Sequence, residues 1–273
     1  MRVAEPIFAP WKAALFLRFQ PEQGKTVLIE KRFEGPLVVQ KPLYPEGDEV
    51  CHAVIVHPPA GLVGGDQLSL HVNTSSGAAV LLTTPGAGKW YRSAGSYASQ
   101  KLRFEVDGSM EWLPQETIMF DGALAEMDCE VSLGAHARYI GWEILCLGRT
   151  GSGERFSKGR IDLRNRISRN GKPLWRERGA IDAGGRLMHS AAGLNGKSVC
   201  ATLVAASPQI SSNVVDACRA VEDVSVTLLP GLLVARHLGD CSESAKQRFI
   251  ELWQVLRPAI IGREAQLPRI WST

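Results

Sequence analysis

The sequence predicts an all-β protein, mainly antiparallel, with two α-helices in its C-terminal third. Three observations indicate this class. Apolar and polar residues alternate with a period of two through most of the chain, turn dipeptides separate these runs, and a helical period occurs only near the end. The 27 Gly and 15 Pro among 273 residues follow no fixed repeat, which is typical of a chain with many turns. With 45% hydrophobic and 22% charged residues, the composition excludes a disordered chain.

Short runs in the first half predict strands. Lys101 to Val106 alternates, Asp107-Gly108 is a preferred turn pair, and the alternation resumes at Met110, so these residues predict a β-hairpin. Another alternating run covers 128–133. Further strands are expected at 15–19, 26–29, 36–40, 53–57 and 78–84.

The second half contains further hairpin signals. Residues 160–167 and 174–178 flank Asn170-Gly171, and residues 224–228 and 232–234 flank Pro230-Gly231. A further strand at 198–204 follows Asn195-Gly196. These patterns predict two hairpins and a single strand between them.

The two helices are expected at 213–221 and 242–256. The first follows a plausible cap at Ser211-Ser212. In the second, apolar residues recur on one helical face, and Pro258 is expected to stop the helix. Because no linker, repeat or low-complexity tract interrupts the chain, we expect one domain over 1–273.

Charge and cysteine usage exclude several classes of protein. A net charge of +3 is too small to indicate bulk affinity for nucleic acid or membranes. The six Cys include no Cys-x-x-Cys pair, which excludes a zinc ribbon or thioredoxin motif. The N-terminal segment lacks a signal-peptide layout, and the longest apolar block, 199–206, is too short to span a membrane. We therefore expect a cytoplasmic protein with reduced thiols.

A strand running into Gly-Ala-Gly-Lys at 86–89 has some likeness to a phosphate-binding loop. That motif requires Gly where this chain has Thr83, and Ser or Thr where it has Trp90. The sequence therefore argues against nucleotide binding at this loop.

Two acidic residues lie in unusual settings. Asp66 ends a Pro- and Gly-rich turn, where it either caps backbone N–H groups or is displayed in a pocket. Glu143 is the only charge in 139–148, a run apolar on both faces that predicts a strand buried on both sides. A buried carboxylate is costly alone, so Glu143 either pairs with an arginine, such as Arg149 or Arg92, or lines an internal wet cavity.

Three other features are ambiguous. Pro114 breaks a strand and leaves Gln115 and Glu116 at the break, where they are either functional or simply solvated. The Arg-rich hairpin at 160–178 is a solvated face, a protein-binding surface or a nucleic-acid surface. Cys51, His52 and His57 are the only local group of metal-binding residue types. His52 and His57 face opposite sides of a strand, which argues against a stable metal site.

Four segments together resemble the UreD family of urease accessory proteins, called UreH in some organisms. They occur in family order and at family-like spacing: HPPAGLVGGD at 57–66, TTPGAGKWYRS at 83–93, WLPQETIMFDG at 112–122 and GWEILCLGR at 141–149. The resemblance implies a mostly β superhelical fold with two helices. It also implies a non-enzymatic maturation factor that binds apo-urease together with a UreF-type protein and a UreG-type GTPase, as a dimer of heterotrimers.

The resemblance further implies that Ni²⁺ crosses the protein through an internal tunnel, with no tightly bound cofactor. Asp66 and Glu143 match positions associated with that tunnel, where they would hold nickel transiently. The remaining tunnel candidates are Glu116, Thr83, Thr84 and Ser93, and the candidates for ordering the loop are Lys89, Arg92 and Arg149. The chain departs from the family pattern at Gly88 and Trp90, where relatives often carry a hydroxyl residue and Phe or Tyr.

Two other functions are compatible with the residues. One is a docking scaffold through which no ion passes, for which Asp66 and Glu143 would be dispensable. The other is a β-rich enzyme or carbohydrate-binding protein, which would bind a ligand without partners.

Overall fold

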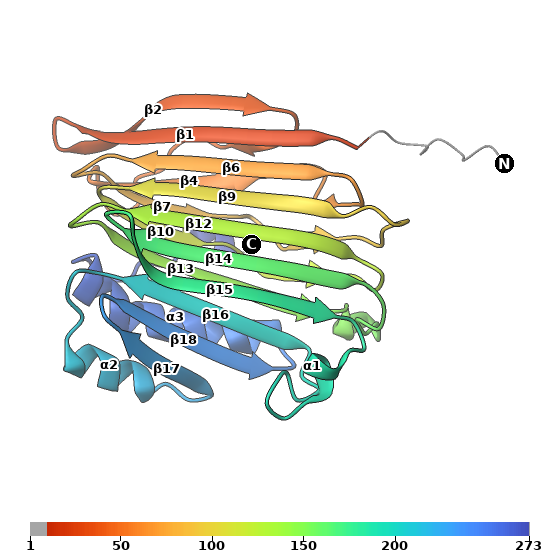
Figure 1. Cartoon of the computed structure of the whole chain (residues 1–273). Coiled ribbons are helices and arrows are strands. Elements are labelled where there is room, and N and C mark those ends of the chain that lie inside the picture. Colours follow the sequence, from red (N-terminus) through yellow and green to blue (C-terminus); the bar gives the residue numbers. More distant parts are fainter. Residues whose placement is uncertain (1–9, 273) are drawn as a thin grey trace.

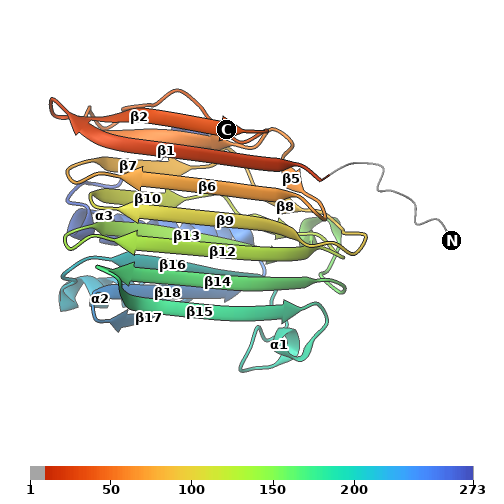
Figure 2. The ribbon, with the colours of Figure 1, turned by 45° about the horizontal axis from the view of Figure 1, so that its top comes forward.

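A computed structural model describes residues 10–272, which form two stacked β-sheets of seven and eleven strands with helices on one side (Figures 1 and 2). The seven-stranded sheet has the order β15 (Lys172–Asp182), β14 (Arg160–Arg169), β12 (Leu124–Leu133), β9 (Ala98–Val106), β6 (Gln67–Thr74), β1 (Lys12–Glu22), β2 (Lys25–Glu34).

The main path of the eleven-stranded sheet has the order β17 (Val224–Leu229), β18 (Leu232–Gly239), β16 (Val199–Ala206), β13 (Arg138–Leu147), β10 (Ser109–Leu113), β7 (Ala79–Thr83), β4 (Val50–Val56), β3 (Val38–Val39). Three short strands extend this sheet beside β13: β11 (Thr117–Met119), β8 (Gly88–Trp90) and β5 (Gly61–Leu62).

The chain passes back and forth between the sheets, so strands that are neighbours in a sheet are seldom neighbours in sequence. The central pairs β6–β9, β9–β12 and β12–β14 are parallel in one sheet, as are β4–β7, β7–β10 and β10–β13 in the other. Antiparallel pairs lie toward the ends of both sheets. The mostly β class is therefore confirmed, whereas the expectation of a mainly antiparallel protein is wrong. Alternation with period two is the same for both strand directions when one face is buried.

The hairpin predicted around Asp107-Gly108 is also wrong. β9 and β10 belong to different sheets, and the turn between them is an arch that crosses from one to the other. The backbone N–H groups of Asp107 and Gly108 donate to the carbonyl of Thr74, at 2.8 and 3.3 Å. A Cβ atom at position 108 would lie 2.2 Å from the carbonyl oxygen of Ala78, so the arch requires glycine. The hairpins β14–β15 and β17–β18 form as predicted.

Two apolar layers hold the molecule together. The first lies between the sheets and includes Phe19, Phe104 and Leu145. The second lies between the eleven-stranded sheet and the helices and includes Trp142 and Phe249. Strand β13 contributes side chains to both layers, as its doubly apolar sequence predicts.

The described residues contain three α-helices: α1 (Arg186–His189), α2 (Ser212–Arg219) and α3 (Ser242–Ile260). Two 3₁₀ helices, η1 (Thr150–Ser152) and η2 (Arg269–Ser272), complete the structure. Helices α2 and α3 overlap the predicted ranges, while α1 was not expected. Pro258 does not stop α3: the helix continues to Ile260, and Gly262, whose φ is +82°, follows the capping residue Ile261. No helix in residues 10–272 is long and apolar enough to cross a membrane.

Candidate functional site

Breaks in two neighbouring strands create a cavity between the sheets. β7 ends at Thr83, and β8 continues its line after a loop. The adjacent β10 ends at Leu113, and β11 continues its line in the same way. Pro114 lacks the N–H group that would continue the ladder, as its position in the sequence predicts. The two breaks lie side by side, and a cavity of about 180 Å³ opens beside them.

This cavity, the larger of two between the sheets, has mostly apolar walls with a few polar groups. The polar side chains are His57, Thr84, Lys89, Gln100, Gln115, Thr117 and Glu143. Pro85 and Gly86 also line the cavity and are exposed at the surface. The cavity therefore reaches the surface at the loop between β7 and β8.

A second cavity of about 80 Å³ adjoins the first, and both are large enough for several water molecules. Four residues line both cavities: Gln100, Leu102, Trp112 and Glu143. The polar side chains of the smaller cavity also include Cys129, Asn165 and Thr202. Asp128 and Arg166 border it too, but their side chains pair with each other at 3.0 Å on the other face of the sheet. We call the two adjoining cavities the inter-sheet passage, with Glu143 at the neck where they meet.

Among residues 10–272, no cationic side chain pairs with Glu143 at the neck. Arg149 pairs instead with Glu154, at 2.7 Å, and Arg92 pairs with Asp121, at 3.6 Å. One carboxylate oxygen of Glu143 is buried without a hydrogen-bond partner in the described part of the chain. Burial raises its pKa to about 7, and a hydrogen bond with Thr117 opposes that rise. Of the two alternatives for Glu143, the structure therefore shows the cavity and not the arginine pair.

Asp66 caps a turn and does not line the passage. Its carboxylate accepts hydrogen bonds from the backbone N–H groups of Val63, at 2.8 Å, and Trp11, at 3.3 Å. Of the two alternatives for Asp66, the structure therefore shows a cap on backbone N–H groups and not a carboxylate displayed in a pocket. The neighbouring His57 does line the larger cavity, with its Nε2 atom buried and without a partner among residues 10–272. Burial lowers the pKa of His57, although the charge of Asp66 acts against this.

The hydroxyl candidates separate into three places. Thr84 lines the larger cavity. Thr83 lies on the helix side of its sheet, where its Oγ1 donates to the carbonyl of Leu113 at 2.6 Å and accepts from the indole of Trp271 at 2.8 Å. Ser93 lies in a surface loop, where its Oγ donates to the carbonyl of Ser96 at 2.5 Å. Only Thr84 of these three faces the passage.

The remaining candidates lie at or outside the larger cavity. Lys89 lines it, whereas Glu116 lies beside it and accepts a backbone hydrogen bond from Gly88 through its carbonyl. Arg92 and Arg149 do not line the cavity; each forms an ion pair with a carboxylate of another loop residue, and the Arg149 guanidinium also stacks on Phe120 at 4.4 Å.

Sequence reasoning missed several residues of the passage. Gln100, Cys129 and Asn165 face it from regular strands, and nothing in their neighbourhoods separates them from ordinary strand residues. Thr202 offered one signal, since it is a polar residue within the apolar block 199–206.

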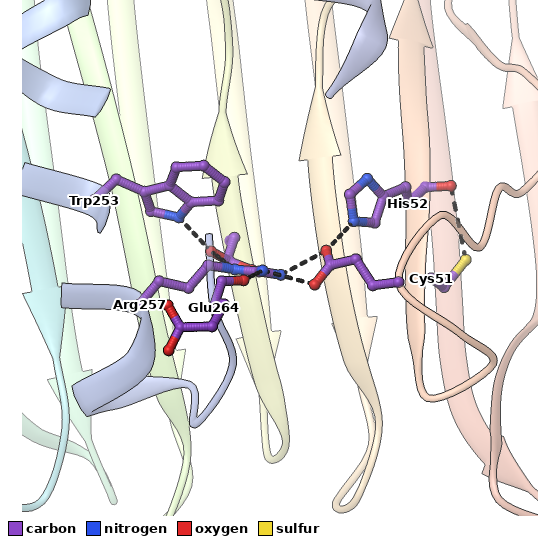
Figure 3. A network of polar contacts seen from close by, with 7 residues as sticks. Cys51, His52, Trp253, Arg257 and Glu264 are labelled. Carbon is purple, nitrogen blue, oxygen red and sulfur yellow. Dashed lines mark hydrogen bonds and ion pairs between the residues drawn. The ribbon is translucent and has the colours of Figure 1, made fainter. Parts of the chain in front are cut away.

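Sequence reasoning also missed a buried ion network on the helix side of the eleven-stranded sheet (Figure 3). Arg257 of α3 is fully buried and donates to Glu46, at 2.6 and 2.7 Å, and to Glu111, at 3.0 and 3.1 Å. His52 contacts Glu46 at 2.5 Å, and the indole of Trp253 donates to Glu111 at 2.6 Å. The available signal was a basic residue, Arg257, on the apolar face of α3.

Electrostatics in this network are dominated by burial and by Arg257. Burial would raise the pKa of Glu46, but hydrogen bonds from His52 and Arg257 hold it at about 2. Burial raises the pKa of Glu111 despite the nearby guanidinium. Burial alone would lower the pKa of Arg257, yet its two carboxylate partners raise it above the ordinary value. The network joins α3 to the sheet and does not reach the passage.

Within residues 10–272, no three His, Cys, Asp or Glu side chains gather in a way that would hold a metal ion. Cys51 faces the inter-sheet core, His52 belongs to the buried network and His57 lies at the larger cavity. The passage therefore offers metal-binding groups singly and not as a cluster.

Comparison with known proteins identifies the family. The family model described as UreD urease accessory protein matches residues 12–272. The chain is 49% identical to the urease accessory protein UreD of Dechloromonas aromatica (strain RCB), over 99% of this chain and 98% of that protein. It is 51% identical to the protein of the same name from Azoarcus sp. (strain BH72), over 96% of this chain and 94% of that protein. The chain therefore belongs to the UreD family of urease accessory proteins.

Proposed function

We propose that this protein acts in urease maturation by giving Ni²⁺ a route through the inter-sheet passage toward the empty urease active site. Family membership supports the role in maturation. The observation that carries the proposed route is Glu143, whose unpartnered carboxylate oxygen lies at the neck between two internal cavities.

The chemistry of the passage suits an ion in transit. Ni²⁺ binds imidazole nitrogen and carboxylate oxygen, and the passage presents one of each in His57 and Glu143. A complete set of four or more protein ligands would hold the ion, whereas single ligands allow it to exchange with water and move on. Cys129 also lines the passage, but burial raises the pKa of its thiol to about 12, and a protonated thiol is a weak ligand.

In this proposal the protein is a non-enzymatic member of a complex. A UreF-type protein and a UreG-type GTPase would join it on the urease apoprotein, as a dimer of heterotrimers. This chain has no phosphate-binding loop at 83–90, so nucleotide hydrolysis would belong to the GTPase partner.

The test is co-expression of a nickel-dependent urease with its accessory proteins, in the presence and absence of this chain. Nickel per purified urease active site is the readout. We expect nickel and activity to fall sharply without the chain and to return with it. Urease that is fully metallated without the chain would contradict the role in maturation.

The route is tested with Glu143→Ala in the same system. We expect nickel loading to fall several-fold while the complex with partners still forms, as judged by copurification. Glu126→Ala is the matched control, because Glu126 is an exposed carboxylate on β12. Normal loading with Glu143→Ala would leave the docking scaffold as the better explanation.

A further inference from the structure

A row of polar side chains leads from Glu143 toward one edge of the molecule. In the eleven-stranded sheet, Thr202 of β16 lies opposite Glu143, and Arg236 of β18 lies opposite Thr202. In the seven-stranded sheet, Cys129, Asn165 and Glu177 occupy matching positions on β12, β14 and β15. The members of both rows that line the smaller cavity face the space between the sheets.

The two rows meet at β15, the end strand of its sheet, and β18, the last strand but one of the other sheet. The guanidinium of Arg236 forms an ion pair with Glu177 across the gap between the sheets, and Asn165 donates to the same carboxylate at 3.2 Å. Side-chain exposures of 51% for Arg236 and 24% for Glu177 place this pair at the surface. Figure 2 shows β15 and β18 toward the same side of the two sheets, with β17 beyond β18.

The smaller cavity approaches the surface at this pair. Asn165 lines the cavity, and together with Arg166 it borders an open surface groove, whose arginine side chains lie on the other face of the seven-stranded sheet. The other residues of the groove are Arg164, Arg176, Glu177 and Arg178. The Asn165 side chain contacts both the cavity and Glu177, so it lies between the inside of the passage and the partly exposed ion pair.

Cys200 provides a second indication that the row is continuous. Burial raises the pKa of its thiol to about 12, and the charges of Glu143, Arg236 and Glu177 also act on it. The Cys200 thiol is thus within electrostatic range of both the neck and the ion pair at the edge.

We propose that the Glu177–Arg236 ion pair closes a second mouth of the inter-sheet passage, with Glu177 as the carboxylate that a divalent cation meets there. The proposal rests on the proposed function. While paired, Arg236 neutralises Glu177 and occupies the site that a cation would take. An exposed ion pair is weak, so it exchanges easily with a competing cation.

The mouth is tested first by access to Cys129, which lines the smaller cavity. The full chain carries Cys241→Ser to remove an exposed thiol, and a small cationic thiosulfonate reagent is used as the probe. Peptide mass spectrometry follows modification of Cys129. We expect Arg236→Gln to speed this modification about two- to fivefold, the range that loss of an exposed ion pair gives.

Arg164→Gln is the matched control, because Arg164 lines the same groove but lies outside the Glu177 pair. It should leave the Cys129 rate unchanged. An Arg236→Lys variant, which keeps a cation beside Glu177, should restore slow modification. If Cys129 is modified at the same rate in the wild type and in Arg236→Gln, and far-UV circular dichroism is unchanged, the proposed mouth is wrong.

Nickel loading of co-expressed urease then separates this proposal from the route itself. We expect Glu177→Gln to lower nickel per active site, as Glu143→Ala does. If Glu143→Ala lowers loading but Glu177→Gln does not, the mouth is wrong and the route stands. If neither variant lowers loading, the route is wrong, and so is the proposal that Glu177 binds a cation at the mouth.

Discussion

The position of Glu143 at the neck of the passage determines the protonation of its carboxylate. Its strand is buried on both faces, and only the local absence of packing at the neck leaves room for a carboxylate. Burial without a cationic partner favours the protonated form, so the pKa of Glu143 rises from its ordinary 4.5 to about 7. A bound cation would reverse this preference.

The raised pKa of Glu143 makes stability depend on pH. Between pH 4.5 and about 7 the folded state keeps a proton that the unfolded state has lost, so stability falls as the pH rises through this window. Glu143→Gln cannot ionise. Relative to the wild type, we expect its free energy of unfolding to increase between pH 5 and pH 8, by on the order of 1–3 kcal/mol. Urea unfolding at both pH values measures this, with Glu126→Gln as the exposed control.

A difference between Glu143→Gln and the wild type that is the same at pH 5 and pH 8 would contradict the raised pKa. The expected sign is the opposite of that for Glu46. Because the pKa of Glu46 is lowered to about 2, its contribution to stability is present above pH 4.5 and is lost as the pH falls through 2.

At the scale of the elements, the arches between sheets decide the fold. The Asp107-Gly108 arch is closed so tightly against Ala78 that no side chain fits at 108. We expect Gly108→Ala to cost about 1–3 kcal/mol of stability through this clash. Gly179→Ala is the control, because a Cβ atom there has no neighbour within 4 Å, and it should cost under about 0.5 kcal/mol. Chemical denaturation of both variants gives the comparison, and equal costs would contradict the steric argument.

Helix α3 is joined to its sheet by the buried network as well as by apolar packing. Arg257→Met would leave Glu46 and Glu111 without their guanidinium, and we expect a loss of about 3–5 kcal/mol near neutral pH. The additional changes Glu46→Gln and Glu111→Gln should recover part of this loss, because they remove the unpaired charges. Urea midpoints of the single and triple variants measure the effect.

Arg219→Met provides the control for α3. Arg219 forms an exposed ion pair with Asp216 on α2, at 3.5 Å, so its loss should change stability by under about 1 kcal/mol. If Arg257→Met costs no more than Arg219→Met, the buried network is not what holds α3 in place.

At the scale of the whole molecule, the two apolar layers share one sheet. Because β13 supplies side chains to both layers, the helices and the sheet stack should unfold together. We expect tryptophan fluorescence and far-UV circular dichroism to give coincident urea transitions. The tryptophans report on both layers: Trp90 and Trp112 lie in the first, and Trp142 and Trp253 in the second. A fluorescence transition that precedes the loss of β-structure would show that the helices detach first.

Local signals in the sequence determined a good part of this protein. Turn pairs at Asn170-Gly171 and Pro230-Gly231 predicted real hairpins, because their strands are adjacent in sequence and pair across a short turn. The doubly apolar run around Glu143 predicted both a strand buried on two faces and an internal carboxylate. The segment 141–149, with three others, predicted the family that the comparisons show.

Only the tertiary structure decided which strands pair and which side chains face the passage. Asp107-Gly108 has the dipeptide of a hairpin but forms an arch, because a turn signal does not specify the partner strand. Asp66 and Glu143 are both isolated carboxylates in the sequence, yet one caps a turn and the other faces a cavity. Glu177 and Arg236 meet across two sheets, and such a contact depends on the register of several strand pairs at once. Period-two alternation determines which face of a strand a side chain occupies, but it does not determine which strands lie beside it. The passage depends on which strands lie side by side.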